Sequence, residues 1–159
     1  MTSSYLDILE DSLKKKKTVL ESIEKYNLSQ SELLKDESFD MEQFDALVDK
    51  KDACIEELEK LDEGFETVYE QIKNELDRDR NQYADQIKRL QELISQVTEK
   101  SVSIQAQEAR NKDMVSAHFK REREAFVQLF EFLNADVFFV HKSIKLLHIK
   151  TFVFQQFAL

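Results

Sequence analysis

Apolar side chains recur at alternating steps of three and four residues in three stretches of the chain, which is the spacing of one face of an α-helix. In the first stretch five of the seven positions of this stripe are apolar; the positions are Leu6, Leu9, Leu13, Lys16, Leu20, Ile23 and Asn27. The pattern predicts an amphipathic helix over residues 4–36. Ser29 is followed three residues later by Glu32, the spacing of a capping box, so we expect a break or a short turn near residues 27–29.

The second stretch has the most regular stripe, with eight of ten positions apolar. Its positions are Phe44, Val48, Lys51, Ile55, Leu58, Asp62, Phe65, Tyr69, Ile72 and Leu76. Asp40 precedes the stripe and Gln43 follows three residues later, again in capping-box spacing, which predicts a helix over residues 40–77. Gly64 lies inside this stripe, and a glycine within a helix indicates a bend or the close approach of another helix.

A third stripe begins after the least apolar stretch, residues 74–85, where we expect a turn. Its positions are Tyr83, Ile87, Leu90, Ile94, Val97, Ser101 and Ile104, and they predict a helix over residues 82–122. Beyond Lys100 small and polar residues take the positions of core leucines. A helix with so thin an apolar stripe is expected to present it to a partner, although the same residues are also typical of the edge of the chain's own bundle. The apolar residues of this weak part are Val102, Ile104, Ala109, Met114, Val115 and Phe119.

Composition supports long helices with few connections. The 159 residues include one glycine and no proline, whereas sheet folds depend on such residues for their turns. The length fits one domain of ordinary size, so the fold class expected is all-α, an antiparallel bundle of about three long helices. The formal net charge of -9 argues against a nucleic-acid binder, which needs a basic face.

The expected compartment is the cytoplasm. Cys54 is the only cysteine, so the chain has no internal disulfide framework, which fits a reducing environment. The N-terminal residues turn acidic at once and lack the apolar core of a signal peptide. No uncharged apolar run approaches the roughly 18 residues of a membrane span.

The row of carboxylates in residues 47–66 is the strongest candidate for acid–base or metal chemistry. Lysines alternate with these acids, and pairs such as Glu56 and Lys60 stand four residues apart, so we interpret the row as a solvated helix face. The four lysines of residues 14–17 are interpreted in the same way. The three histidines are scattered, no Glu-x-x-His pair occurs, and one glycine cannot form a phosphate loop. We therefore expect no enzyme, no metal and no cofactor.

Several segments, in this order and spacing, resemble the FlgN-type flagellar export chaperones over roughly residues 5–122. They are "YLDILEDSLKKKKTVLESI", "LLKDESFDMEQFDALVDKKDACIEELEKLDEGFE" and "EARNKDMVSAHF". In the last segment Asn111 followed by Met114 and Val115 is similar to an Asn-x-x-Leu-Ile element of that family, which adds Asn111 to the expected partner-binding residues.

The resemblance implies a small cytoplasmic helical chaperone. Such proteins hold hook-filament junction (hook-associated) proteins before secretion and deliver them to the flagellar type III export machinery, usually through their C-terminal helix. Two alternatives stay open from the residues. One is a homodimeric coiled-coil scaffold without a client. The other is an interfacial membrane binder that uses the Phe-rich tail with Lys142, Lys145 and Lys150, which the net acidity of the chain opposes.

The composition changes near residue 125, which divides the chain into a helical domain (1–124) and an atypical tail (125–159). Residues 1–125 contain 50 of the 55 charged side chains, whereas residues 126–159 contain eight of the twelve phenylalanines. The resemblance ends at the same place. We predict that the tail arose from a shifted reading frame or a faulty gene model; the alternatives are a tail that folds back over the third helix and one that binds membrane. Translation of the other two reading frames past codon 124 tests this prediction. If neither frame encodes a charged helical continuation, the prediction is wrong.

Overall fold

The computed structural model describes residues 1–36, 38 and 40–120, and these residues form helices and turns without a strand. Helix α1 (Thr2–Lys35) is joined by a short loop to α2 (Met41–Arg78), and a single 3₁₀ turn, η1 (Arg80–Tyr83), leads into α3 (Ala84–Lys120). The all-α prediction is confirmed. The starts of all three helices and the ends of the first two lie within two residues of the expected positions, whereas the expected end of the third at residue 122 lies outside the described residues. The boundary at residue 124 and the origin of the tail lie outside the described residues and stay predictions.

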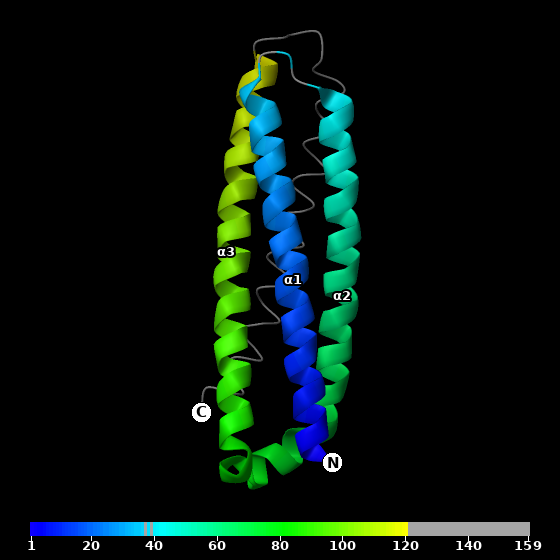
Figure 1. The fold of residues 1–159 in the computed structure, drawn as a ribbon, viewed down its shortest axis with the longest axis vertical. Coiled ribbons are helices and arrows are strands. Elements are labelled where there is room, and N and C mark those ends of the chain that lie inside the picture. The colour runs from blue at the N-terminus through cyan, green and yellow to red at the C-terminus, as the bar shows by residue number, and fades with distance from the viewer. Residues whose placement is uncertain (37, 39, 121–159) are drawn as a thin grey trace.

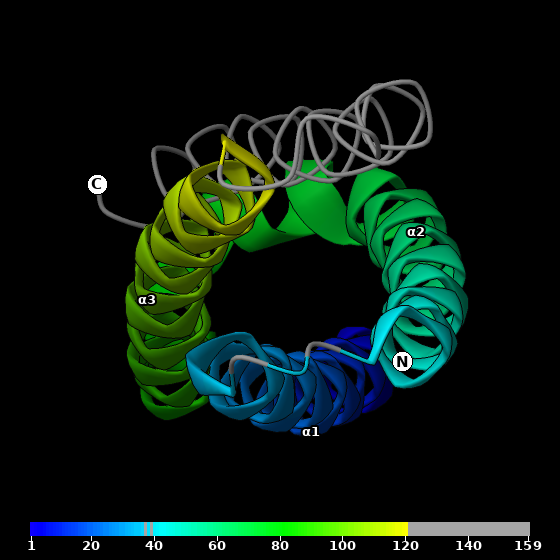
Figure 2. The ribbon, with the colours of Figure 1, turned by 90° about the horizontal axis from the view of Figure 1, so that it is seen from above.

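The three helices lie lengthwise, with α1 and α3 running in one direction and α2 in the other (Figure 1). Helix α1 packs against both α2 and α3, whereas α2 and α3 approach each other much less closely. The end view shows α1 between the other two (Figure 2). The buried face of α1 therefore packs against two helices and is wider than a stripe that faces one helix. It includes Val19 beside the row of Leu6 and the row of Leu9.

One of the two expected helix starts is confirmed and the other is wrong. Asp40 is the N-cap of α2, and its Oδ1 accepts a hydrogen bond from the backbone N–H of Gln43 at 3.2 Å. Ser29 lies inside the continuous helix α1, where its Oγ donates to the carbonyl oxygen of Lys25 at 3.1 Å. The neighbouring polar residues Asn27 and Gln30 are buried against the other helices, so tertiary contacts keep this segment helical despite its capping signal.

Gly64 does not mark a close approach between helices. It lies within α2, and a Cβ atom built on it would have no atom within 4 Å outside its own helix. The expectation of a close helix contact at this glycine is therefore wrong, and the residue faces open space.

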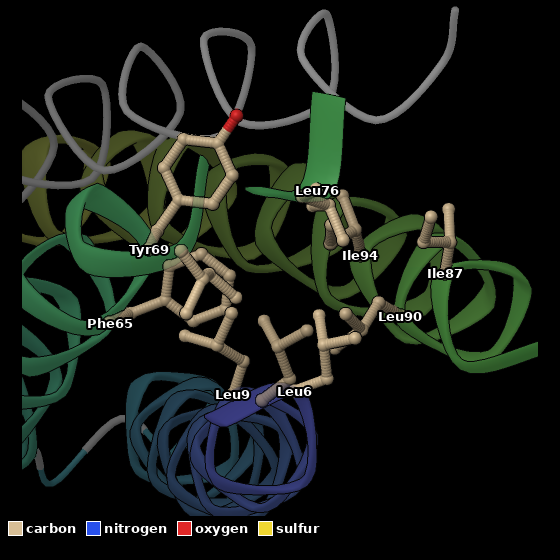
Figure 3. Packing of buried hydrophobic residues seen from close by; sticks show 10 residues of the cluster. Leu6, Leu9, Phe65, Tyr69, Leu76, Ile87, Leu90 and Ile94 are labelled. Carbon is tan, nitrogen blue, oxygen red and sulfur yellow. The ribbon is translucent and has the colours of Figure 1, made fainter. Parts of the chain in front are cut away.

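The buried apolar residues of the described chain form three clusters along the bundle. The turn-end cluster is the largest and lies next to η1; Leu6 and Leu9 of α1 point between Phe65 of α2 and Leu90 of α3 (Figure 3). Its ten residues are Leu6, Leu9, Leu13, Phe65, Tyr69, Ile72, Leu76, Ile87, Leu90 and Ile94. The middle cluster has seven: Val19, Leu20, Ile23, Ile55, Leu58, Val97 and Ile104. The far-end cluster has three: Leu34, Phe44 and Val115.

Candidate functional site

The residues expected to bind a partner on α3 do not share one surface. Ile104, Asn111 and Val115 are buried, and Val115 has no exposed surface. Val102 is 53% exposed and Ala109 is also exposed. Met114 is half-buried. The side chain of Phe119 lies outside the described part of the chain.

The buried members of this set pack against α1 and α2. Ile104 belongs to the middle cluster and Val115 to the far-end cluster. Met114 packs beside Val115, with its Sδ 3.9 Å from the Oγ of Ser31. The structure thus unites Ile104, Asn111 and Val115 in the bundle interior, and Val102 and Ala109 on its surface. Contact of any of them with a partner stays a prediction.

Sequence reasoning missed a buried polar site, which we call the Lys51 centre: Asn27, Gln30, Lys51, Glu108 and Asn111. The Nζ of Lys51 lies 2.6 Å from Glu108 Oε1, 2.7 Å from Gln30 Oε1 and 3.1 Å from Asn27 Oδ1. Asn111 Nδ2 donates to the backbone oxygen of Asn27 at 2.8 Å. The side chains of Lys51 and Glu108 are each 2% exposed. One ammonium group therefore joins all three helices between the middle and far-end clusters.

A second polar layer separates the turn-end and middle clusters. Lys16 of α1 and Asp62 of α2 form an ion pair, with side chains 5% and 10% exposed. Burial lowers the pKa of Lys16, and the attraction of Asp62 only partly offsets this effect. The other carboxylate oxygen of Asp62 is buried and has no hydrogen-bond partner among the described residues. The Lys51 centre likewise keeps one such atom, the buried Nε2 of Gln30, so each polar layer has one buried polar atom without a hydrogen-bond partner among the described residues.

These layers correct two expectations. Lys14 and Lys15 are exposed as expected of residues 14–17, but Lys16 is buried. The carboxylates of residues 47–66 are exposed except Asp62. The sequence did contain a signal for this burial, because Lys16, Asp62 and Lys51 occupy positions of the apolar stripes. An unpaired charge is costly to bury, so charged residues at such positions indicate buried ion pairs.

The edge between α1 and α3 is polar and charged. Arg89 Nε lies 3.0 Å from Glu10 Oε2, and hydrogen bonds from Lys14 and Arg89 lower the pKa of Glu10. Farther along, Lys100 Nζ lies 2.8 Å from Glu24 Oε2, and this bond raises the pKa of Lys100. Such half-exposed pairs align two helices but contribute little stability each.

The acidity of the protein is concentrated on one helix. Helix α2 carries thirteen acidic and five basic side chains, whereas α1 carries six of each and α3 carries five acidic and six basic. The first turns of α2 contain Glu42, Asp45 and Asp49, all exposed. Slight desolvation of the exposed carboxyl group, together with the charge of Asp49, raises the pKa of Asp45. A partner that approaches α2 from its first turns therefore meets negative charge.

The candidate sites within the described residues are the helix surfaces and the two buried polar layers. They contain no group of three or more His, Cys, Asp or Glu side chains placed to hold a metal ion. Burial raises the pKa of Cys54, which keeps its thiol protonated and weakens it as a nucleophile. None of the helices in this part of the chain is long and apolar enough to cross a membrane.

Comparison with known proteins identifies a family for this chain. A family model described as FlgN protein matches residues 1–129, which is most of the chain. No curated protein and no solved structure matches it. The family match covers all three helices and both buried polar layers, and on this evidence the chain belongs to the FlgN family of flagellar export chaperones.

Proposed function

We propose that this protein binds hook-filament junction proteins in the cytoplasm and delivers them to the flagellar type III export machinery. Membership of a family of flagellar export chaperones supports the general role. The observation that carries the specific proposal is the surface of α3, where Val102 is half exposed at a position that would otherwise favour a polar side chain. A client's amphipathic terminal helix fits such a surface, because helix-on-helix recognition uses apolar anchors at helical spacing.

Charge placed on this surface tests the proposal. Val102→Asp with Ala109→Asp changes two exposed residues seven positions apart on α3, so the bundle interior is untouched. Val115→Asp is less informative, because Val115 is fully buried and the change would also disrupt the far-end cluster. The matched control is Ser103→Asp with Ala117→Asp, which adds the same charge to exposed positions outside the stripe.

The measurement is co-purification of each variant with the junction proteins of the same organism, alongside its helical circular dichroism signal. We expect the Val102/Ala109 variant to lose binding at least about tenfold while keeping its helicity, since a charge in an apolar contact costs more than 1.4 kcal/mol. The control variant should bind as the unchanged protein does. Undiminished binding by the Val102/Ala109 variant would show that the client contacts another surface.

A further inference from the structure

Among the described residues, fewer fully buried apolar side chains pack at the far end of the bundle than elsewhere. The far-end cluster has three of them in this part of the chain, whereas the middle cluster has seven and the turn-end cluster ten. At this end α1 finishes, α2 begins and the last described turns of α3 lie (Figure 1). Because burial of apolar surface is the main favourable term in packing, this end is the part of the described bundle that opens most readily.

The Lys51 centre separates this end from the middle cluster. It joins the three helices through the ammonium group of Lys51 on α2, the carboxylate of Glu108 on α3, and side-chain amides of α1 and α3. A buried ion pair gains little net stability over apolar packing, because desolvation offsets its attraction. The apolar contacts that make a bundle unfold as one unit are therefore interrupted here, with Ile104 on one side and Val115 on the other.

The expected partner-binding residues fall across this boundary. Val115 and Met114 lie in or against the far-end cluster, and Asn111 belongs to the Lys51 centre. A buried residue such as Val115 can contact a partner only if the end of α3 separates from α1. Opening would expose the three buried side chains together with the half-buried residues packed around them: Leu33, Met41, Val48 and Met114.

We propose that the far end of the bundle opens as one unit up to the Lys51 centre, and that the exposed cluster receives the apolar face of a client helix with basic flanks. The cluster Leu34, Phe44 and Val115 supplies the apolar contact. The basic flanks follow from charge complementarity, since the first turns of α2 beside it present Glu42, Asp45 and Asp49. The identity of the occupant rests on the proposed function, whereas the opening itself does not.

Opening is tested with matched buried valines on α3. Val97 and Val115 are 1% and 0% exposed, and each is changed to Cys in a Cys54→Ser background. The rate of reaction with a thiol reagent in native buffer reports how often each site opens. We expect Val115→Cys to react at least about tenfold faster than Val97→Cys, at equal midpoints of urea unfolding. Equal rates would overturn the proposal.

Amide hydrogen exchange of the wild-type protein measures the same opening without any substitution. Amides of residues 111–118 should exchange as one group, and those of residues 94–104 should exchange far more slowly, with a step between the two. A gradual increase from residue 94 to residue 118 would indicate simple fraying of a helix end and would overturn the proposed unit.

The occupant is tested by adding a hook-filament junction protein that co-purifies with the wild-type chain. We expect it to slow exchange in residues 31–35, 41–48 and 111–118 and to bind more weakly as salt is raised. Slower exchange confined to other segments, or binding that is insensitive to salt, would overturn this part. If no junction protein binds at all, the proposed function fails, while the exchange step in the free protein still decides the opening.

Discussion

Removing the carboxylate of Asp62 should destabilise the bundle far more than a typical single substitution. In Asp62→Leu the ammonium of Lys16 stays in the interior, where its side chain is 5% exposed, without its ion-pair partner. Breaking a buried pair in this way costs about 3–5 kcal/mol, because an uncompensated charge remains. A domain of this size has on the order of 5–15 kcal/mol of stability, so the loss is a large fraction of the whole.

Replacing both partners should recover most of this loss. Lys16→Met with Asp62→Leu places two apolar side chains between the turn-end and middle clusters. One oxygen of Asp62 has no hydrogen-bond partner among the described residues, so the native layer is incompletely satisfied. A packed apolar pair in place of such an ion pair is neutral or stabilising by about 1–4 kcal/mol. The two substitutions should therefore couple by at least about 3 kcal/mol.

The pH dependence of the single variant gives an independent check. Burial already lowers the pKa of Lys16 below its usual 10.5, and loss of Asp62 removes the attraction that opposes this shift. Between the folded pKa and 10.5 the unfolded chain binds more protons than the folded one. The stability of Asp62→Leu should therefore rise with pH in that window, by up to about 1.4 kcal/mol per pH unit.

The assay is urea unfolding followed by circular dichroism, applied to the wild type, Asp62→Leu, Lys16→Met and the double variant at several pH values. Met and Leu favour helices, so propensity changes little. Additive effects of the two substitutions, or a loss below about 1 kcal/mol in Asp62→Leu, would refute the argument, because the pair would then behave as a solvated surface bridge.

Three smaller predictions concern local features. Gly64→Ala should raise the free energy of unfolding by about 0.5–1 kcal/mol, since the added methyl meets open space and glycine is a poor helix former; a loss of stability in urea unfolding would contradict this. Asp40→Ala removes the bond to the N–H of Gln43 and should cost about 1 kcal/mol, with Asp40→Asn nearly neutral in the same assay. Glu10→Gln should lower stability by up to about 1 kcal/mol at neutral pH. The pKa of Glu10 is lowered from 4.5 by its bonds to Lys14 and Arg89, so this difference should be complete above pH 4.5 and vanish as acid protonates the carboxyl group in the wild type. A difference that persists at low pH would assign the effect to packing.

The helices, and those of their ends that lie within the described residues, were predictable because the signals are local. Periodic apolar residues, few turn-forming residues and the cap at Asp40 act within a few residues of one another, and the structure agrees with them. The local signal at Ser29 failed, because the buried side chains of Asn27 and Gln30 hold α1 continuous. The candidate site was less predictable. Whether Val115 faces solvent or Phe44 depends on how three helices pack, and one stripe alone cannot reveal that.

The sequence by itself determined that this chain forms three amphipathic helices, since the three-and-four spacing of apolar residues is a property of each segment. It also placed Lys16, Asp62 and Lys51 on the buried stripes. Only the tertiary structure decided which of these charges meet. Stripes that repeat every seven residues permit several registers, and a slip of α2 by seven residues would set Ile55 or Tyr69 against Lys16 in place of Asp62. Burying that charge without a carboxylate is costly, so pairing across helices selects the register, and such pairing exists only once the helices are packed.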